Sequence, residues 1–407
     1  MKGILLAIFM MGQLFIATAQ VGIGTSTPDN SAALEIKDSA RGILIPRLTM
    51  AQRLAIQNPA QGLMVYQNDS TKGYWYYEGT KWKNIYGYAG NGPVGGKTTL
   101  LLSDTISNAQ AQSVIDADFG PNTQELYIVG CTRLTTLTLP KLVNAINIFI
   151  TDNSVLSSVN LPDLKNVAGH LYFANCPLLA TVNMPLLQNI LLNTVTFETS
   201  LLVYNTRIVD IDFPALKRVT GIVSIQNNPH THSINFPLLE KSHTLWIMAN
   251  QHLTSISTPL LTQSAYLWTD NNADLPALSF PALTSIGRFV ITNNPDLTSI
   301  GFPVLTEIAV QLPTIFDTDT RIDNCRNLST FDMGSLVKFS NTDFKIMNTK
   351  LSSATINNLL HNFVSIVPAI DDKNIRLSSQ SPAAPPTGQG IIDKATLITN
   401  GNTVATD

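Results

Sequence analysis

Prolines recur at a nearly constant interval through the middle of this 407-residue chain, and this repeat constrains the fold more than any other feature. Successive prolines are separated by 22, 23, 29, 23, 22, 22 and 22 residues, with an insertion near residues 191–200. A ninth copy has Gly334 in the proline slot, after an extra loop at residues 310–318. A fixed period of this size is the signature of a solenoid, in which each copy forms one turn. The prolines are Pro140, Pro162, Pro185, Pro214, Pro237, Pro259, Pro281 and Pro303.

Nine residues before each proline slot lies a position that holds only asparagine or cysteine. A buried asparagine side chain can satisfy backbone groups of the neighbouring turn, so a column of them predicts a ladder of hydrogen bonds. All three cysteines of the chain fall in this column, and we expect free, buried thiols rather than disulfides or nucleophiles. The predicted ladder comprises Cys131, Asn153, Cys176, Asn205, Asn228, Asn250, Asn272, Asn294 and Cys325.

Two more columns of the repeat are apolar, and they predict the core. Every copy has leucine two residues after the proline slot, and Leu, Val, Ile or Phe six residues after the Asn/Cys slot. Just before the Asn/Cys slot, apolar residues alternate with period two, as at Ile148 and Ile150, which predicts a strand with one buried face. One strand per turn makes a long parallel sheet whose neighbouring strands are about 4.8 Å apart. We expect nine to ten rungs of about 22 residues.

The recurring string of residues 289–308 resembles the receptor L-domain branch of leucine-rich repeat proteins. The resemblance covers about residues 120–350, and leucine-rich repeats make the same choice between asparagine and cysteine. It implies a mainly β, right-handed parallel solenoid with a role in adhesion or recognition, and it implies no particular ligand. The chain lacks the disulfide-rich modules of the receptor proteins, so the resemblance implies no signalling role.

The first 19 residues have the features of a secretory signal peptide. Lys2 precedes an apolar run at residues 4–16, and Ala17-Thr18-Ala19 fits the small-x-small cleavage pattern. A signal anchor is the alternative, but the apolar run is short for a membrane span. We expect a secreted or cell-surface protein with no transmembrane segment in the mature chain.

Residues 20–86 lack the repeat and are similar to an N-terminal module of secreted and phage-tail-fibre-like proteins of Gram-negative bacteria. The similarity rests on the strings at residues 21–25, 41–49 and 62–66 and on a predicted hairpin at residues 74–82. We expect a small β-rich domain for attachment or for homo-oligomerisation. The predicted organisation is then signal peptide 1–19, N-terminal domain 20–86, linker 87–97, N-terminal cap 98–125, solenoid 126–350 and C-terminal cap 351–407.

Only 13% of the residues are charged and the net charge is −3, about half the usual charge content. A disordered chain or a nucleic-acid-binding protein would need far more charge of one sign, so we expect no nucleic-acid partner. The repeat accounts for the deficit, because its turns are built from neutral polar residues such as Asn, Thr and Ser.

One outward column of the predicted sheet is rich in aromatic residues. Large exposed rings mark contact surfaces, so this column is the candidate site for a glycan or a surface protein. The alternatives are that the rings only stabilise the sheet as cross-strand pairs, or that the N-terminal domain covers them. The full column reads Tyr127, Phe149, Tyr172, Leu201, Ser224, Trp246, Trp268, Val290 and Arg321, and its five aromatic residues are the predicted ligand-binding residues.

The sequence gives only weak signals for a metal site or a phosphate-binding loop, and we expect no metal and no cofactor. A second column contains His230, His252, Asp274 and Asp296, but ligands that rise about 4.8 Å per rung do not readily surround one ion. The string Gly95-Gly96-Lys97-Thr98 lacks the earlier glycine of a phosphate-binding loop.

No carboxylate pair or activated nucleophile emerges from the spacing, since Asp270 and Asp323 point outward two rungs apart. We therefore expect a binding or adhesion protein rather than an enzyme. A polysaccharide-active β-helix enzyme is the runner-up, and a purely structural envelope or fibre component is the third alternative.

Overall fold

The computed structural model describes residues 20–69, 73–80, 82–84, 96–192, 198–309 and 319–407. The chain forms two compact units, Met1–Gly87 and Tyr88–Asp407. The predicted signal peptide and most of the predicted linker lie outside the described residues. Within the described ranges, no helix is long and apolar enough to cross a membrane.

The first unit is small and β-rich. β1 (Val21–Ile23) pairs in parallel with β2 (Leu34–Ile36). A second sheet has the order β3-β4-β5-β6 and also carries the short helix α2. Its elements are β3 (Arg47–Leu48), α2 (Met50–Leu54), β4 (Met64–Gln67), β5 (Gly73–Tyr77) and β6 (Trp82–Asn84). β5 and β6 are antiparallel, as the predicted hairpin requires.

Arg53 holds the second sheet of this unit together. Its side chain is buried, its Nε donates to Oε1 of Gln67 at 2.8 Å, and its guanidinium lies 3.9 Å from the ring centroid of Trp75. A guanidinium over an aromatic face is a favourable contact that also keeps the cation hydrogen-bonded. A polar and aromatic cluster thus replaces the aliphatic core that so short a segment cannot supply.

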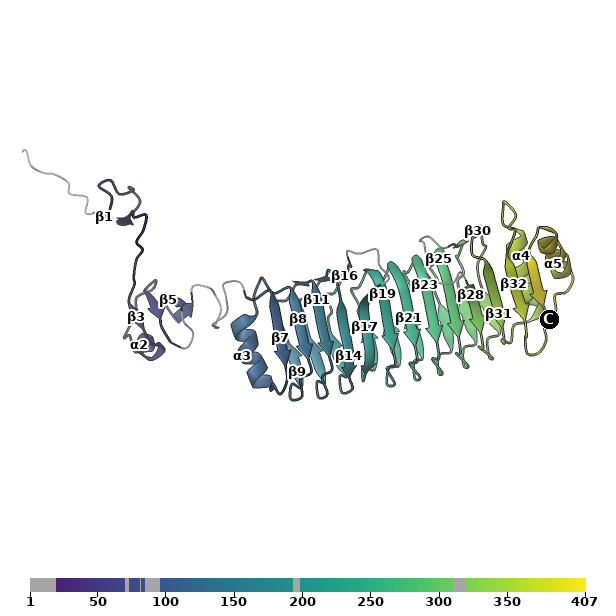
Figure 1. Ribbon diagram of the computed structural model, residues 1–407, viewed down its shortest axis with the longest axis horizontal. Helices are drawn as coiled ribbons and strands as arrows, with labels where there is room; N and C mark the ends of the chain where they lie inside the picture. Colours follow the sequence, from purple (N-terminus) through teal and green to yellow (C-terminus); the bar gives the residue numbers. More distant parts are fainter. Residues whose placement is uncertain (1–19, 70–72, 81, 85–95, 193–197, 310–318) are drawn as a thin grey trace, which may run out of the picture. The chain divides into compact units, whose positions relative to one another are not determined.

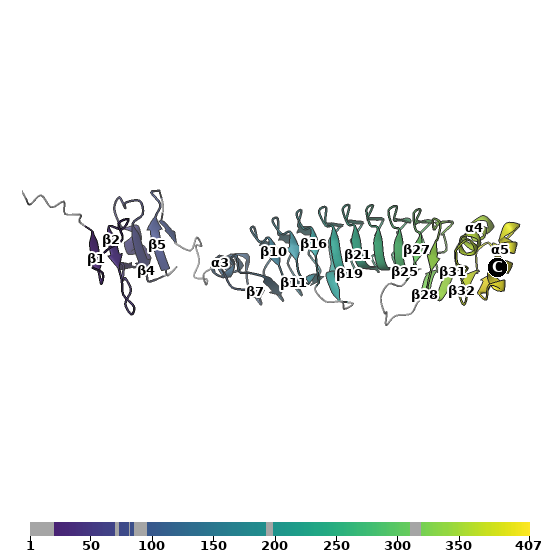
Figure 2. The same cartoon turned by 90° about the horizontal axis from the view of Figure 1, so that it is seen from above.

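The second unit is a parallel β solenoid, which confirms the predicted fold class (Figures 1 and 2). Each turn contributes one main strand to an 18-stranded sheet, counted over the described residues. The main strands are β7 (Thr99–Ser103), β8 (Glu125–Val129), β11 (Asn147–Thr151), β14 (Leu171–Cys176), β17 (Thr199–Thr206), β19 (Arg218–Gln226), β21 (Lys241–Met248), β23 (Gln263–Asp270), β25 (Ser285–Thr292), β28 (Asp319–Asp323), β31 (Asp343–Met347), β32 (Asn374–Ser378) and β33 (Thr403–Thr406).

Short strands complete the turns. Two-residue strands enter the main sheet ahead of their main strands: β10 (Asn144–Ala145), β13 (Asn166–Val167), β16 (Asn189–Ile190), β27 (Glu307–Ile308) and β30 (Lys338–Phe339). Three-residue strands form three further parallel ladders: β9 (Thr136–Thr138), β12 (Ser158–Asn160) and β15 (Thr181–Asn183); β18 (Asp210–Asp212), β20 (Ser233–Asn235) and β22 (Ser255–Ser257); β24 (Ala277–Ser279), β26 (Ser299–Gly301) and β29 (Thr330–Asp332). The core lies between these two layers.

The solenoid has about 12 turns, so the expectation of nine to ten rungs was too low. The segments predicted as caps add their own strands to the main sheet. β7 pairs in parallel with β8 at one end, and β31, β32 and β33 continue the ladder at the other. The same two segments contain the helices α3 (Asn108–Asp118), α4 (Ser353–Val364) and α5 (Gln389–Thr399).

The inward columns are buried as the alternation predicts. Ile148, Ile150, Phe289 and Ile291 have no exposed surface. At the end of the main strand, one residue in the left-handed region turns the chain, with φ between +51° and +67°. Asparagine, aspartate and glycine tolerate this region best. The twelve residues are Asp104, Gly130, Asp152, Asn175, Asn205, Asn227, Ala249, Asn271, Asn293, Asn324, Asn348 and Ser379.

Candidate binding surface

From Cys131 to Gln380, the residue after each of these left-handed positions is buried in the solenoid and forms the polar ladder. Asn250 shows the pattern: its Oδ1 accepts from the backbone N–H of Asn228 at 3.1 Å, and its Nδ2 donates to the carbonyl of Ile225 at 3.0 Å. The same two bonds, to the preceding turn, are made by Asn153, Asn228, Asn272 and Asn294. These buried amides satisfy backbone groups that would otherwise be unpaired.

Cysteine replaces asparagine in three turns of the ladder. All three thiols are free and buried, and Sγ of Cys176 donates to the carbonyl of Ile150 at 3.5 Å. Burial raises the pKa of Cys131 and of Cys325 to about 11. A thiol with so high a pKa is a poor nucleophile at neutral pH.

Asn205 does not belong to the ladder, and this prediction was wrong. Asn205 is exposed and left-handed, whereas the next residue, Thr206, is buried and donates its backbone N–H to Oδ1 of Asn228 at 3.0 Å. The turn has one residue fewer between the ladder position and its proline, so counting back from Pro214 missed by one. Sequence reasoning also missed Thr349 and Gln380, which extend the ladder through a 2.5 Å bond between Oγ1 and Oε1.

The one-residue error also moves the predicted outward column, because a shift of one residue exchanges the two faces of a strand. Leu201 is fully buried, and Leu202 pairs with Tyr172 and Ser224 in the outward column. The column as the structure has it reads Leu101, Tyr127, Phe149, Tyr172, Leu202, Ser224, Trp246, Trp268, Val290, Arg321, Lys345, Arg376 and Ala405.

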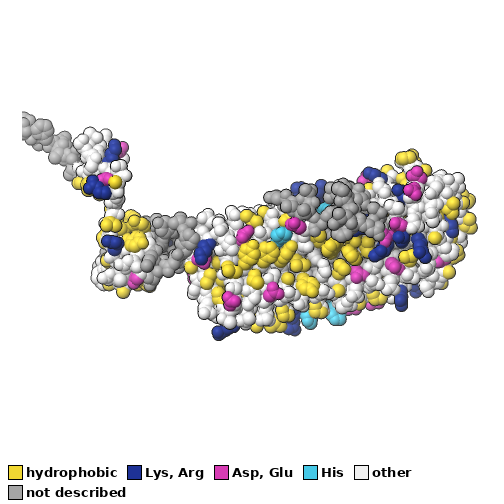
Figure 3. Space-filling model, viewed as in Figure 1, with side chains coloured by type: hydrophobic (Ala, Val, Ile, Leu, Met, Phe, Trp, Pro, Cys, Tyr) yellow, Lys and Arg dark blue, Asp and Glu magenta, His cyan; other side chains and the backbone are white. Residues whose placement is uncertain are grey.

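The five predicted ligand-binding residues form two separate groups. Tyr127, Phe149 and Tyr172 lie on consecutive strands, as do Trp246 and Trp268, and Leu202 and Ser224 separate the groups. All five aromatic side chains are partly buried. The space-filling view shows hydrophobic side chains gathered over the first main strands, and cationic ones toward β28 and β31 (Figure 3).

The rings of the first group pack against one another. Tyr127 and Phe149 are stacked, with centroids 5.2 Å apart and planes 20° apart. Phe149 meets Tyr172 edge to face at 5.1 Å, and His170 lies 5.2 Å from the ring of Tyr172. Each of the three rings is therefore in contact with at least one other ring of the group.

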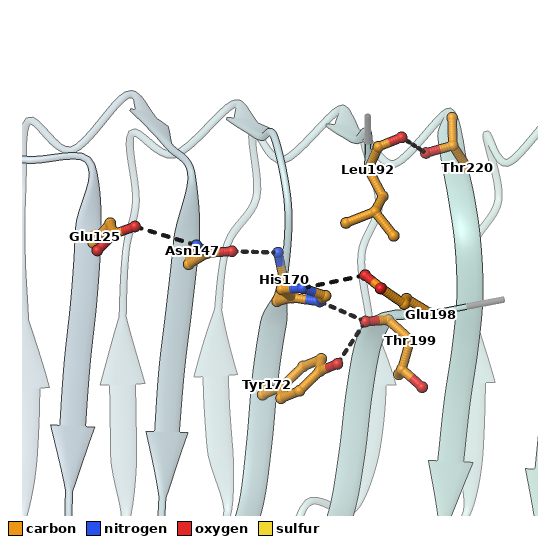
Figure 4. A network of polar contacts seen from close by, with 8 residues as sticks. All are labelled: Glu125, Asn147, His170, Tyr172, Leu192, Glu198, Thr199 and Thr220. Carbon is orange, nitrogen blue, oxygen red and sulfur yellow. Dashed lines mark hydrogen bonds and ion pairs between the residues drawn. The ribbon is translucent and has the colours of Figure 1, made fainter. Parts of the chain in front are cut away.

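A polar network borders the first group (Figure 4). Asn147 donates Nδ2 to Oε1 of Glu125 at 3.3 Å and accepts the backbone N–H of His170 at 3.0 Å. The carbonyl of Thr199 accepts from the phenol of Tyr172 at 2.7 Å and lies 2.8 Å from Nδ1 of His170. Within this network, the side chain of Tyr172 is therefore held in place through both its ring and its hydroxyl.

Glu198 supplies the second carboxylate beside this group. Its Oε2 lies 3.9 Å from Nε2 of His170, and its side chain is half exposed. Burial, with the charge of Glu198 beside it, raises the pKa of the Tyr172 phenol. The network therefore combines fixed aromatic rings with carboxylates at their border.

The tryptophan pair is packed differently. Trp246 and Trp268 meet edge to face at 5.8 Å, and Tyr266 lies 5.8 Å from Trp268. The guanidinium of Arg288 lies 4.1 Å from the Tyr266 centroid. Both indole Nε1 atoms are buried, with no hydrogen-bond partner among the described residues. These contacts favour cross-strand packing over ligand stacking for the pair.

The C-terminal part of the column carries ion pairs. Asp319, which is almost fully buried, pairs with Arg321 at 2.8 Å and with Lys345 at 3.3 Å. Lys345 also pairs with Asp343 at 3.2 Å. The outward face therefore changes along its length, from rings bordered by carboxylates to lysine and arginine side chains paired with aspartates.

The other candidate groups are held in small local contacts. Nδ1 of His252 lies 2.9 Å from Oδ2 of Asp274, and its ring stacks 6.2 Å from that of His232. Asp270 accepts from Thr292, and Lys97 pairs with Asp118. Over the part of the chain that the structure describes, no three His, Cys, Asp or Glu side chains converge as metal ligands.

Comparison with known protein families identifies one similarity. Residues 22–101 match the model of a phage tail-like trimerisation region. The match covers about a fifth of the chain and spans the first unit and the start of β7. It supports the tail-fibre-like character predicted for residues 20–86. No curated protein and no solved structure matches the chain.

Proposed function

We propose that this protein is an exported, trimeric, fibre-like surface protein whose solenoids bind a glycan or a protein through the outward sheet face. The observation that carries this proposal is the match of residues 22–101 to a phage tail-like trimerisation region, in the same chain as a parallel β solenoid. The first unit joins three chains, and the solenoid forms a recognition arm. The receptor L-domain resemblance supports the recognition role.

Exposed apolar side chains of the first unit support the association. Val21, Ile23 and Leu34 on the paired strands β1 and β2 are each more than half exposed, and Ile43 and Leu44 are exposed by 59% and 79%. Apolar surface of this kind is what a subunit interface covers. In a closed trimer each subunit uses two different patches, one for each neighbour.

The oligomeric state of the mature chain, residues 20–407, tests the proposal. Native mass spectrometry and sedimentation velocity should show a trimer. The double substitution Ile23→Asp with Leu34→Asp should weaken association by about tenfold or more for each buried side chain lost. Val337→Asp is the control, because Val337 is 62% exposed on the solenoid. A monomeric mature chain, or a trimer that survives the double substitution, would contradict this assembly.

A purely structural fibre component is the second candidate, favoured by the same match. Glycan arrays and surface-protein pull-downs separate the two, since a structural component binds neither. Release of reducing ends from polysaccharides during the same incubation would contradict a binding role and favour the enzyme alternative.

A further inference from the structure

We propose that the first five main strands carry a docking surface for a polypeptide segment with apolar and basic side chains. The surface, called here the ridge, consists of Leu101, Tyr127, Phe149, Tyr172 and Leu202 on the outward face of β7, β8, β11, β14 and β17. This inference rests on the recognition role proposed above and assigns it to one part of the sheet and one class of partner.

The ridge is continuous and accessible. Its five residues are consecutive in the outward column, and neighbouring strands lie about 4.8 Å apart, so the ridge is about 20 Å long. Leu101 is 58% exposed and the four other side chains are half-buried. A row of apolar groups fixed on strands can be buried by a partner at little conformational cost.

Ring orientation favours apolar side chains over sugars as the contacting groups. Sugar stacking needs an open ring face, but Tyr127 and Phe149 cover each other at 5.2 Å and 20°. Phe149 packs against Tyr172, whose ring is also covered by His170 and whose hydroxyl is bonded to Thr199. Rings that are already packed against one another form a rigid apolar surface, which suits aliphatic or aromatic side chains of a polypeptide.

The charged residues beside the ridge favour a basic partner. Glu125 and the half-exposed Glu198 border the ridge on the side of its polar network. The five strands of the ridge contain no lysine or arginine. At the other end of the same column stand Arg321, Lys345 and Arg376. A basic segment is therefore attracted to the ridge, whereas at the far end Arg321 and Lys345 are already paired with Asp319 and Asp343.

The tryptophan pair serves as an internal comparison. Trp246 and Trp268 share the column with the ridge, but their indole N–H groups are buried and their strands are separated from it by Ser224. If recognition used exposed rings in general, both groups would contribute. The ridge proposal predicts that only the first group does.

Calorimetric titration of the full mature chain with three defined probes tests the proposal. The probes are a decapeptide of alternating leucine and lysine, the same peptide with glutamate in place of lysine, and cellohexaose. The lysine peptide should bind, with an affinity that falls as salt is raised, and the two others should bind at least tenfold more weakly.

Substitutions locate the binding. Leu101→Ser should weaken the lysine peptide about tenfold, because it removes an exposed apolar contact without touching the core. Glu198→Gln should weaken binding a few-fold at low salt and have no effect at high salt. The controls Val337→Ser and Trp246→Ala/Trp268→Ala should leave the affinity unchanged.

The opposite results overturn the proposal in distinguishable ways. Equal binding of both peptides would refute the charge argument, and unchanged affinity in Leu101→Ser would refute the location. Binding of cellohexaose that is lost in the tryptophan variant would refute this ridge while preserving a recognition role. Loss of the trimer in Leu101→Ser would show that a second copy of the chain covers the ridge.

Discussion

The asparagine ladder allows a quantitative test of what holds the turns together, and Asn250→Ala is the sharpest perturbation. Asn250 is fully buried, and its side chain makes two bonds to backbone groups of the preceding turn, from the Asn228 N–H at 3.1 Å and to the Ile225 carbonyl at 3.0 Å. Alanine leaves the Asn228 N–H without its acceptor and removes one donor from the carbonyl.

Each buried backbone group that loses its partner costs about 1–3 kcal/mol. Two such groups, with the small cavity that the amide leaves, give a loss of about 3 kcal/mol in the free energy of unfolding. Asn250→Cys should cost less, about 1–2 kcal/mol, because a thiol can still donate to the carbonyl as Cys176 does. Asn183→Ala is the matched control. Asn183 is exposed and lies outside the buried ladder, and its side chain donates to Oδ1 of Asn160.

Urea unfolding followed by far-UV circular dichroism measures the loss, and hydrogen exchange localises it. The Asn228 amide should exchange about a hundredfold faster in Asn250→Ala, while amides several turns away keep their rates. An unfolding free energy within 1 kcal/mol of the Asn183→Ala value, or unchanged exchange at Asn228, would refute the ladder as a source of stability.

Two further predictions concern single positions. Ala249 is left-handed at φ +54°, where most other turns have asparagine, so Ala249→Asn should raise the unfolding free energy by about 1 kcal/mol in the same urea titration. The pKa of Cys131 and Cys325 rises from 9.0 to about 11 on folding, so the unfolded chain loses these protons first. Stability should therefore be full below pH 9 and fall between pH 9 and about 11, and replacing both cysteines with serine should flatten that fall. A native chain that reacts with Ellman's reagent at pH 8 as fast as the unfolded chain would contradict thiol burial.

The repeat was sufficient to predict the class of fold. Columns such as Ile148 and Ile150 alternate with outward residues, and this pattern is compatible only with a strand that has one buried face. The ends of the solenoid were less predictable, because their strands lack the proline and leucine columns. β7, β32 and β33 join the sheet through backbone hydrogen bonds, which leave little trace in side-chain sequence.

The candidate surface shows how far residues can be placed by counting from the prolines of the repeat. The proline spacing located Tyr127, Phe149 and Tyr172 on one outward column, and backbone pairing places them there. The same count failed at Leu201 and Asn205, because that turn is one residue shorter between its ladder position and Pro214. Counting back from a proline assumes a constant number of residues between that proline and the ladder position. The hydrogen-bond register changes when this number changes by one.

By itself, the sequence determined that this chain forms a parallel solenoid with a neutral polar surface, an apolar interior and three free thiols. Those properties follow from residue type and period alone. Only the tertiary structure decided how the rings pack and which polar groups lie beside them, because burial and ring orientation depend on contacts between neighbouring turns. It separated Tyr172, beside the half-exposed Glu198, from Trp268, whose indole N–H is buried.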